Sequence, residues 1–482
     1  MNIVAEITKI LKNSIANGDS CIPEAALASL FKKIFSEALK EALENLDDQI
    51  CQEYAQDGYH CEGRDSRSIQ FLFGEATFRR RRMKKGDAKG VYALDKELGI
   101  PSGKRYSPEM MAVIAEIATS ITYRNLACAV WKLTGITMSH QKIAGIVREV
   151  GKACEKYEER EAREDCQDKK TPEILYIEGD GVVLKKGKTG PDGTVLKETQ
   201  EIHRFQIYEG IEYRNDRGVL QGAHFFSGLS RKDTLLRVKA FLSGHYDLSR
   251  TIIISNSDNG VGYREDDFDD LFTCYKRHDH FLDRYHLNRK LKERLAGVPK
   301  ELKNKLETGI REHDEEQVKQ ALDTMESRIT DLQSREAHNI DKLRKYLKRN
   351  WDDLRSAKER NLEEIGNIGT CESNHRIFTY RMKRQGRKWS NGGGTAMIKI
   401  ITAMKNGTLR NALMRQNEDF KAYHKEATKT LQKCVKRAYK TINKSGKNRY
   451  KDHIGALEGS IAVYGPSSSP MGALKTALLR GY

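Results

Sequence analysis

Apolar residues in the first third of the chain recur every three or four positions, which is the spacing of amphipathic helices. The pattern predicts helices over residues 1–50, as in PEAALASLFKKIFSEALKEALENL, and again over residues 107–150. Between them, residues 68–83 predict a short hairpin followed by a run of arginines. This run either faces a phosphate backbone or forms a solvated edge. It consists of Arg79, Arg80, Arg81 and Arg82.

The helical segment after the arginines carries capping signals. Ser107 and Pro108 mark a helix start, because Ser caps free amide groups and Pro fits the first turn. Gly135 separates two helical runs, and Ser139 is the predicted cap of the second. Helix, glycine-bearing turn and helix is the helix-turn-helix pattern, which predicts either a DNA-reading segment or ordinary bundle packing. A charged helix then leads to a domain boundary near Pro172.

From residue 173 the pattern changes to the alternating and short apolar runs that are typical of strands. Two helical segments, residues 232–245 and 265–272, interrupt these strands. The five predicted strands lie at residues 173–186, 201–213, 222–229, 251–255 and 278–283. Three strands, helix, strand, helix and strand predict a meander followed by crossovers to parallel strands. This is the order of the ribonuclease-H-like fold, an α/β core with a mixed five-stranded sheet.

Long polar helices follow the fifth strand and predict an all-helical insertion in this core. Glu372 then precedes a basic segment interleaved with aromatic residues, and the C-terminal region is rich in Lys and Arg. Six segments result: a helical N-terminal segment with a basic hairpin (1–90), a helix-turn-helix-like DNA-binding region (91–171), the first section of the ribonuclease-H-like core (172–283), the helical insertion (284–365), the second section of that core (366–405) and a basic helical C-terminal region (406–482).

The composition narrows the partners. The 482 residues carry a formal net charge of +17, which favours nucleic acid as the partner. The nine cysteines are scattered and form no CxxC pair, so we expect free thiols in a reducing cytosol and no zinc ribbon. No segment has the apolar length that a membrane span needs, and the N-terminus is amphipathic. These features predict a cytoplasmic protein with no membrane partner.

Three acidic residues stand where the ribonuclease-H-like fold has catalytic carboxylates. They are Asp180 in EGDG, Asp258 in NSDNG and Glu372 in TCESN. Mg²⁺ and Mn²⁺ prefer oxygen ligands, and two such ions can activate an attacking hydroxyl and stabilise a leaving oxygen. The three acids therefore predict a site for two Mg²⁺ or Mn²⁺ ions. The plainer alternatives are turn residues for the two aspartates and a helix-dipole partner for Glu372. Glu178 shares the strand face of Asp180 and competes as first ligand.

Further polar residues fall close to these acids in the predicted fold. Asp283 and His286 share a helix face, either near the active site or as a helix cap beside a packed histidine. His375 lies one turn beyond Glu372 and either faces DNA or lies on the surface. The predicted DNA contacts that follow are Arg376, Arg381, Lys383, Arg384, Arg387 and Lys388. No GxxxxGK[ST] or GxGxxG loop occurs, so no nucleotide cofactor is expected.

An ordered set of motifs is similar to a known family over about residues 65 to 410. The motifs are FLFGEATFRRRRMKK…LDKELGI, GDGVVL, NSDNGVGY, HFLDRYHLNRK and CESNHRIFTYRMKRQGRKWS. Together they resemble the ISLre-type family of bacterial insertion-sequence transposases, long described as an uncharacterised protein family. That family is similar to Mutator-type transposases, which have an Asp-Asp-Glu triad in a ribonuclease-H-like core with a helical insertion and a C/D-x-x-H motif.

The resemblance implies specific roles and a function. Asp180, Asp258 and Glu372 match the triad, and Asp283 with His286 matches D-x-x-H. The implied protein is a transposase that binds terminal inverted repeats, cleaves a 3′ end and joins it to target DNA, as a homo-oligomer on paired ends. The alternative is a non-catalytic or domesticated copy that only binds DNA. A junction resolvase is a third possibility, against which the long insertion and the large basic flanks count.

Overall fold

The structure is a computed structural model that describes residues 3–17, 23–98, 100, 102–189, 195–215, 217–330, 334–362, 365, 368–384 and 387–414. The chain divides into two compact units, Met1–Lys421 and Ala422–Tyr482, and the described residues belong to the first. The predicted C-terminal region (406–482) lies outside the described residues from position 415 onward. Within the described part of the chain, no helix is both long and apolar enough to cross a bilayer.

The N-terminal part combines helices with a hairpin. It contains α1 (Ile3–Ala16), α2 (Glu24–Gln56), β1 (His60–Phe71), β2 (Gly74–Lys84), β3 (Val91–Tyr92) and α3 (Ala93–Glu97). The predicted helices and hairpin are confirmed, but the hairpin is longer than residues 68–83. The arginine run lies within β2 instead of following the hairpin. Successive side chains therefore alternate between the two faces of the strand.

The four predicted DNA-contacting arginines have different environments. Arg79 and Arg82 are exposed. Arg80 is only 8% exposed, and its Nε donates to Asp95 Oδ2 at 2.8 Å. The half-buried Arg81 pairs with Asp47 and Asp48. The prediction that Arg80 contacts DNA is therefore wrong, because its charge is buried against an acid of α3.

The helices predicted between 107 and 150 are α4 (Pro108–Ala118), α5 (Tyr123–Thr134) and α6 (His140–Ala162). The predicted caps are confirmed: Ser107 accepts from Met110 N and Ser139 from Lys142 N. Their core is shared with α14 (Asn391–Lys405), α15 (Leu409–Met414) and apolar residues of the sheet. The buried ammonium of Lys399 on α14 also pairs with Glu158 on α6 at 2.7 Å. The predicted segments 91–171 and 366–405 thus pack into one core.

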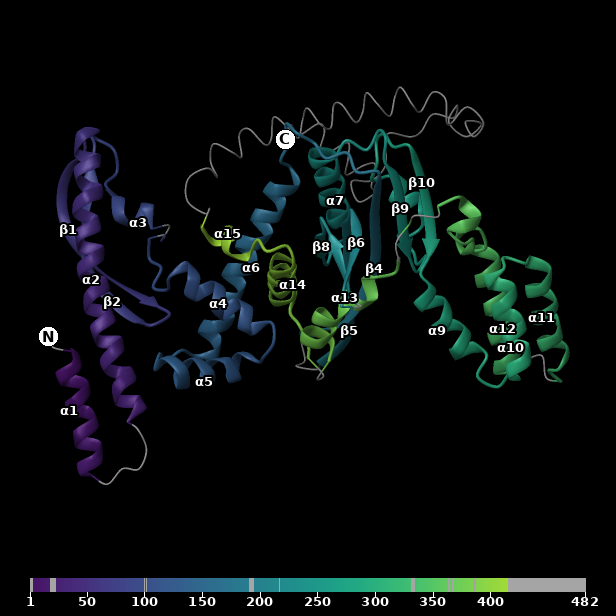
Figure 1. Cartoon of the computed structure of the whole chain (residues 1–482), viewed down its shortest axis with the longest axis horizontal. Coiled ribbons are helices and arrows are strands. Elements are labelled where there is room, and N and C mark those ends of the chain that lie inside the picture. Colours follow the sequence, from purple (N-terminus) through teal and green to yellow (C-terminus); the bar gives the residue numbers. More distant parts are fainter. Residues whose placement is uncertain are drawn as a thin grey trace. The chain divides into compact units, whose positions relative to one another are not determined.

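The central sheet has five strands: β4 (Ile174–Thr189), β5 (Val195–Tyr208), β8 (His224–Gly228), β9 (Ile252–Ser257) and β10 (Arg277–Leu282) (Figure 1). Their order is β10-β9-β4-β5-β8. β5 is antiparallel to β4 and β8, whereas β9 is parallel to β4 and β10. The predicted mixed five-stranded sheet is confirmed. A separate ribbon of β6 (Gly210–Arg214) and β7 (Arg217–Gln221) was not predicted, because the pattern of residues 201–213 indicates a single strand.

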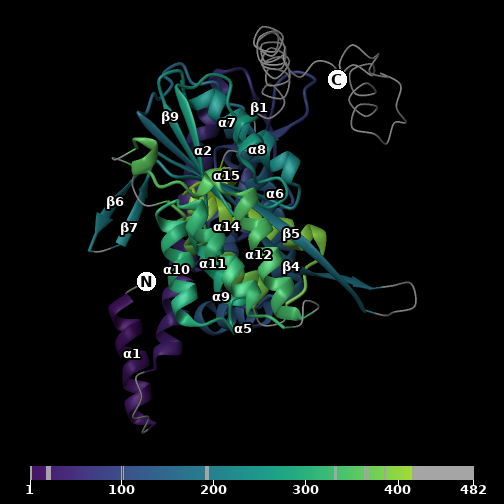
Figure 2. The same cartoon turned by 90° about the vertical axis from the view of Figure 1, so that its right-hand side faces the viewer.

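The two faces of the sheet have different cores. On one face, residues of β4, β5, β8 and β9 pack against α7 (Arg231–His245) and α8 (Glu265–Asp269). On the other face, Val182, Leu184 and Ile202 pack with Phe378 and the helices α6 and α14. Beyond Asp180, β5 is the one strand paired with β4 among the described residues, so the two strands continue past the rest of the sheet as a two-stranded arm (Figure 2).

The predicted insertion is confirmed as helical, with its own core. It contains α9 (Arg284–Arg294), α10 (Lys300–Arg311), α11 (Glu315–Ser327), α12 (Arg335–Arg349) and the short turns η1 (Asp352–Leu354) and η2 (Lys358–Arg360). The chain then forms α13 (Cys371–Phe378) and the π-helical turn η3 (Thr379–Lys383) before α14. The insertion thus joins the carboxyl end of β10 to α13, which returns to the sheet.

Candidate active site

The predicted acids come from four elements. Asp180 lies within β4, and Asp258 follows the last residue of β9. Asp283 follows β10 and caps α9, while Glu372 is the second residue of α13. β4, β9 and β10 are parallel, so the carboxyl ends of β9 and β10 meet at one edge of the sheet. In open α/β sheets, this edge is where ligands bind.

Asp180 is buried between two histidines. Its side chain is on the face of β4 that α13 covers, and the residue is 7% exposed. Asp180 Oδ1 accepts from Gly181 N at 2.6 Å, and Oδ2 lies 3.5 Å from His375 Nδ1 and 3.6 Å from His286 Nε2. The interaction with Asp180 raises the pKa of His286 although burial opposes it. The two predicted near-site histidines therefore flank the first predicted ligand.

Glu178, the competing first ligand, has a different environment. It is fully buried, and its carboxylate accepts from Gly369 N at 2.8 Å and Thr370 N at 3.1 Å. It also accepts from Tyr208 Oη at 2.7 Å and Gln206 Nε2 at 2.8 Å. Protein donors thus satisfy both carboxylate oxygens. The same bonds attach the start of α13 to β4, so Glu178 holds the helix that carries Glu372 and His375.

Asp258 lies in a tight loop, as the cluster of small and polar residues indicates. Its Oδ1 accepts from Gly260 N at 2.8 Å, which closes a turn around the carboxylate. Asn259 has φ 55° and Gly262 has φ 85°, the left-handed backbone that Asn and Gly tolerate best. A Cβ at Gly262 would also overlap the Arg231 guanidinium at 1.5 Å. The loop therefore depends on its residue types, and it leaves Asp258 half-buried.

The helical insertion holds this loop through the buried side chain of Asn259. Asn259 Nδ2 donates to Asn350 Oδ1 at 3.0 Å and to Asp353 Oδ2 at 2.5 Å, both beyond the last turn of α12. Its Oδ1 lies 2.6 Å from Nε2 of His280, whose pKa burial lowers to about 3. A neutral His280 can donate this bond. The second predicted ligand is therefore positioned jointly by β9, β10 and the insertion.

Asp180 and Asp258 both shift the pKa values of the same neighbouring residues. Burial and then both aspartates raise the pKa of Glu201, and both also favour the protonated form of His286. Burial raises the pKa of Asp283 as well, and Asp180 is among the charges that add to the effect. The charges of Asp180, Asp258, Glu201 and Asp283 are therefore close enough to influence one another or shared neighbours.

Glu201 was not singled out from the sequence. It is exposed and belongs to the arm, where a Cβ at Gly181 would come within 1.8 Å of its Oε1. The absence of a side chain at Gly181 makes room for this carboxylate. No sequence signal fixes the pairing of β4 with β5, and this pairing sets Glu201 opposite Val183, close enough for Asp180 to raise its pKa. Only the folded chain therefore brings Glu201 close to the predicted acids.

The predicted metal ligands fit divalent cations in their chemistry. Asp180 and Asp258 supply carboxylate oxygens, the donors that Mg²⁺ and Mn²⁺ favour. The backbone of Glu372 lies in the first turn of α13, and its side chain is outside the described residues. Among the side chains that the structure describes, no three acidic, His or Cys groups are already arranged as a metal-binding set. The ligand assignment stays a prediction.

The predicted DNA contacts after Glu372 are only partly on the surface. Arg376, Lys383, Arg384 and Lys388 are exposed, whereas Arg387 is half-buried. Arg381 is 4% exposed, and its Nε donates to Ala118 O at 2.6 Å. Burial lowers the pKa of Arg381 to about 10. The prediction that Arg381 contacts DNA is therefore wrong: it joins η3 to α4 inside the shared core.

Ser255, His278 and Asp269 contact one another in series, but they do not form a second active site. Ser255 Oγ lies 2.6 Å from His278 Nε2, and His278 Nδ1 lies 2.7 Å from Asp269 Oδ1. Such contacts are known from hydrolases that use a serine nucleophile. However, Ser255 is fully buried within β9 and also contacts His280 at 2.7 Å. No substrate can reach this serine, so the contacts serve to order the sheet beneath Asp258.

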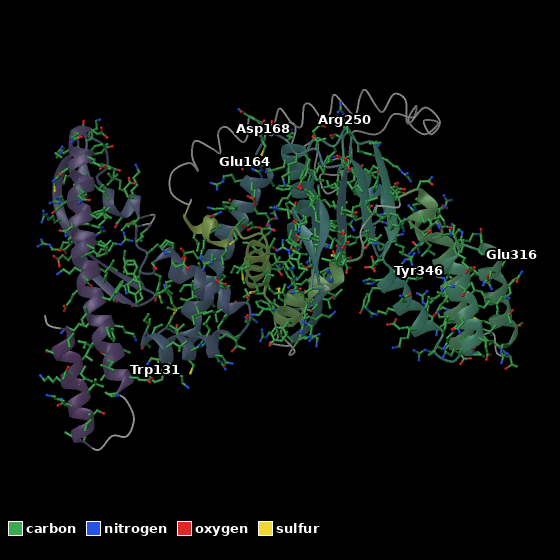
Figure 3. All side chains as sticks on the ribbon, viewed as in Figure 1. Trp131, Glu164, Asp168, Arg250, Glu316 and Tyr346 are labelled. Atoms are coloured by element: carbon green, nitrogen blue, oxygen red, sulfur yellow. The ribbon has the colours of Figure 1, made fainter. Side chains whose placement is uncertain are left out.

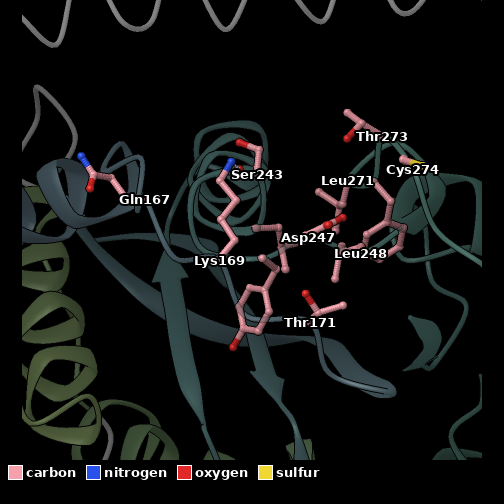
Figure 4. Close-up of a pocket in the computed structure, with 12 residues that line it drawn as sticks. Gln167, Lys169, Thr171, Ser243, Asp247, Leu248, Leu271, Thr273 and Cys274 are labelled. Atoms are coloured by element: carbon pink, nitrogen blue, oxygen red, sulfur yellow. Dashed lines mark hydrogen bonds between the residues drawn. The ribbon is translucent and has the colours of Figure 1, made fainter. Parts of the chain in front are cut away.

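The cavity drawn in Figure 4 is also separate from the acids. It has a volume of about 470 Å³ and is lined by the segment before β4, the end of α7 and the loop before β10. Leu248 and Thr273, which line it, precede β9 and β10, whereas Asp258 and Asp283 follow these parallel strands. The cavity therefore lies at the opposite edge of the sheet from the candidate active site.

Comparison with known proteins places the chain in a family. Residues 23–418 match the family described as "Uncharacterised protein family (UPF0236)". The "UPF0236 protein in vanSb 3'region" of Streptococcus gallolyticus is 33% identical over 477 residues, which cover 98% of this chain and 99% of that protein. The chain therefore belongs to UPF0236.

A comparison with solved structures found the "Drosophila P element transposase strand transfer complex". The alignment covers 68% of this chain and 88% of that chain, at 10% identity and a TM-score of 0.22. A likeness at this TM-score carries no argument about fold or function.

Proposed function

We propose that the protein is a DNA transposase with a ribonuclease-H-like core and an Asp-Asp-Glu active site. The observation that carries the proposal is the β10-β9-β4-β5-β8 sheet with antiparallel β5, combined with the positions of the three acids. Asp180 is within the first strand of the sheet along the chain, Asp258 directly follows the fourth and Glu372 is on a later helix. The motif resemblance to ISLre-type transposases supports the same function.

Asp180, Asp258 and Glu372 would hold one or two Mg²⁺ or Mn²⁺ ions. Bound ions would supply Lewis-acid activation of the attacking hydroxyl and stabilise the leaving oxygen of a phosphodiester. The chain itself contributes the alignment of the acids. Glu178 fixes α13 to β4, and Asn259 fixes the Asp258 loop to the insertion. His286 and His375 keep the Asp180 carboxylate oriented from two sides.

The polyanionic substrate follows from the charge distribution. The net charge is +17, and the exposed cations of residues 376–388 lie directly after the helix that carries Glu372. Trp389 N donates to Lys185 O at 3.2 Å, which attaches this basic segment to the two-stranded arm. We assign these cations to the DNA backbone and the element's terminal inverted repeats to the substrate. Paired ends require at least two copies of the protein on DNA.

The test is a plasmid that carries the gene's own flanking DNA, incubated with the purified protein. With Mg²⁺ or Mn²⁺ we expect nicks at the 3′ ends of the terminal repeats and joined products with target DNA. Asp258→Asn should abolish both reactions without loss of DNA binding. Strong DNA binding without cleavage at any metal concentration would instead establish a non-catalytic DNA-binding protein.

A further inference from the structure

Three cations of the insertion converge on one aromatic ring. Tyr346 on α12, which Figure 3 labels, has Lys290 Nζ 4.0 Å from its ring centroid. The guanidinium carbons of Arg294 and Arg349 lie 5.7 Å and 6.0 Å from the same centroid. Lys290 and Arg294 belong to α9, whereas Arg349 ends α12. We call these three residues the insertion cations.

None of the insertion cations forms an ion pair with an acid among the residues that the structure describes, although neighbouring cations do. Arg344, also on α12, pairs with Asp323 at 2.7 Å and Glu326 at 2.9 Å. Arg289 on α9 pairs with Glu293 at 2.8 Å. Among the described residues, these three side chains form one hydrogen bond, from Arg294 Nη1 to the carbonyl of Lys342 at 3.0 Å. Arg344 and Arg289 thus form ion pairs with acids, whereas the insertion cations do not.

Converging like charges are unfavourable unless an anion compensates for them. Burial lowers the pKa of Lys290; Asp258 opposes this effect, whereas Arg294 and Arg349 add to it. The face of Tyr346 offsets part of this repulsion by a cation–π interaction. The Tyr346 hydroxyl is buried and has no hydrogen-bond partner among the described residues. Three positive charges therefore lie close together around Tyr346, and an anion with several acceptor oxygens would compensate for them.

These charges are next to the second predicted metal ligand. Arg349 is followed by Asn350, whose Oδ1 accepts a hydrogen bond at 3.0 Å from Asn259, the residue after Asp258. Among the charges, Asp258 has the largest effect on the pKa values of Tyr346 and Lys290, and it raises both. Asp283 also acts on Tyr346. The insertion cations therefore adjoin the Asp258 side of the candidate active site, where a DNA strand would leave or enter it.

We propose that Lys290, Arg294 and Arg349 form a subsite for a phosphodiester of the DNA strand bound beside Asp258. The proposal rests on the proposed function and specifies a substrate contact made by the insertion. A phosphate group fits because it presents several oxygens to two guanidinium forks and one ammonium group. A free nucleotide is a poor match, because the sequence contains no glycine-rich phosphate loop.

The experiment measures the affinity of duplex DNA carrying one element end, by fluorescence anisotropy with EDTA present. Removing metal separates this contact from catalysis. We expect Lys290→Met and Arg349→Met each to weaken binding by about fivefold to tenfold and to lower the slope of log K against log salt by about 1. The matched control is Lys345→Met, because Lys345 is on α12 but pairs with Asp341 at 2.8 Å. This control should bind within about twofold of the parent.

Each outcome decides between possibilities. Equal affinity of the parent, Arg349→Met and Lys345→Met overturns the subsite but leaves the proposed function intact if the parent still cleaves. A parent that binds no DNA overturns the proposed function itself. Inorganic phosphate is the second probe: if it stabilises the parent but not Arg349→Met, while DNA affinity is unchanged, the site takes free phosphate and the DNA assignment is wrong. Because Arg349 is exposed, its variant keeps the test valid if Lys290→Met does not fold.

Discussion

The hairpin β1–β2 and the helical insertion both gather positive charge, but Arg80 and Arg81 of the hairpin form ion pairs that the insertion cations lack. Arg80 and Arg81 belong to the densest basic run in the sequence, yet both pair with acids that the fold brings to them. Lys290, Arg294 and Arg349 are spread over 60 positions and converge on Tyr346 without forming an ion pair with any described acid. The comparison shows that a dense basic run does not by itself mark a surface for DNA. What matters is whether the fold supplies a counter-charge.

The acids of the sheet divide in the same way. Glu178 and Asp180 are two residues apart on one face of β4. Glu178 receives five hydrogen bonds from distant parts of the chain, whereas Asp180 receives only its neighbour's amide and faces two histidines. We therefore interpret Glu178 as a residue of the scaffold and Asp180 as a residue of the active site. The following predictions can break or sharpen this division.

The largest expected effect concerns the neutralised hairpin. Asp95→Ala would leave Arg67 and Arg80 buried without their shared carboxylate. Removing one partner of a buried ion pair costs about 3–5 kcal/mol. Denaturant unfolding should show this loss, with less than about 0.5 kcal/mol for the exposed control Asp87→Ala. An unchanged free energy of unfolding for Asp95→Ala would mean that the ion pairs of Asp95 with Arg67 and Arg80 do not stabilise the hairpin.

The next effect concerns Glu161, a half-buried acid at the end of α6. Burial and the nearby Glu164 and Glu158 raise the pKa of Glu161 to about 7. His224, 3.8 Å away, is neutral there because burial lowers its pKa to about 3. The folded state therefore binds a proton that the unfolded state loses above about pH 4.5. This contribution to stability is fully present below pH 4.5 and is lost as the pH rises through about 7, by at most about 3 kcal/mol.

Denaturant titrations between pH 4.5 and pH 8 measure this effect. Glu161→Gln should flatten the pH dependence and should be more stable than the parent at pH 8. Glu37→Gln, which changes an exposed acid of α2, serves as the control and should retain the parent's pH dependence. Parallel curves for the parent and Glu161→Gln would show that Glu161 ionises normally in the folded protein.

The smallest effects on stability distinguish Glu178 from Asp180. Glu178→Gln removes a charge that accepts five hydrogen bonds, so we expect the free energy of unfolding to fall by about 2 kcal/mol. Asp180→Asn should change the free energy of unfolding by less than about 1 kcal/mol, because little in the protein satisfies this charge. Cleavage should respond in the opposite order and disappear only in Asp180→Asn. If Asp180→Asn is the less stable variant and still cleaves, the two roles are reversed.

Much of the fold could be predicted from the sequence, because its signals are local. Periodicity and capping residues such as Ser107 and Ser139 defined helices, and short apolar runs defined the five strands of the sheet. The ribbon β6–β7 was missed because the turn that separates β5 from β6 carries no Pro and no strong break in polarity. The error at Arg80 has a different origin. Only tertiary structure brings Asp95 to β2.

The acids of the candidate site could be predicted from the sequence. The residues that position these acids or lie beside them could not. Asp180 and Asp258 were recognisable because each interrupts or ends a strand pattern. Asn259 and Glu201 were not, since their roles depend on strand pairing and on contacts with residues more than 90 positions away or across the arm. Lys290 and Arg349 were likewise joined only by the packing of α9 against α12. Long-range polar contacts leave no periodic trace in a sequence.

The most direct test of the proposed function is the single-turnover rate of 3′-end cleavage on a labelled element end with Mg²⁺. The measurement compares the parent with Asp258→Asn and with Asp266→Asn, an exposed acid of α8. The proposed function predicts a loss of at least about a thousandfold for Asp258→Asn, about 4 kcal/mol in the barrier, and parental rates for Asp266→Asn. Parental cleavage by Asp258→Asn would contradict the assignment of the active site.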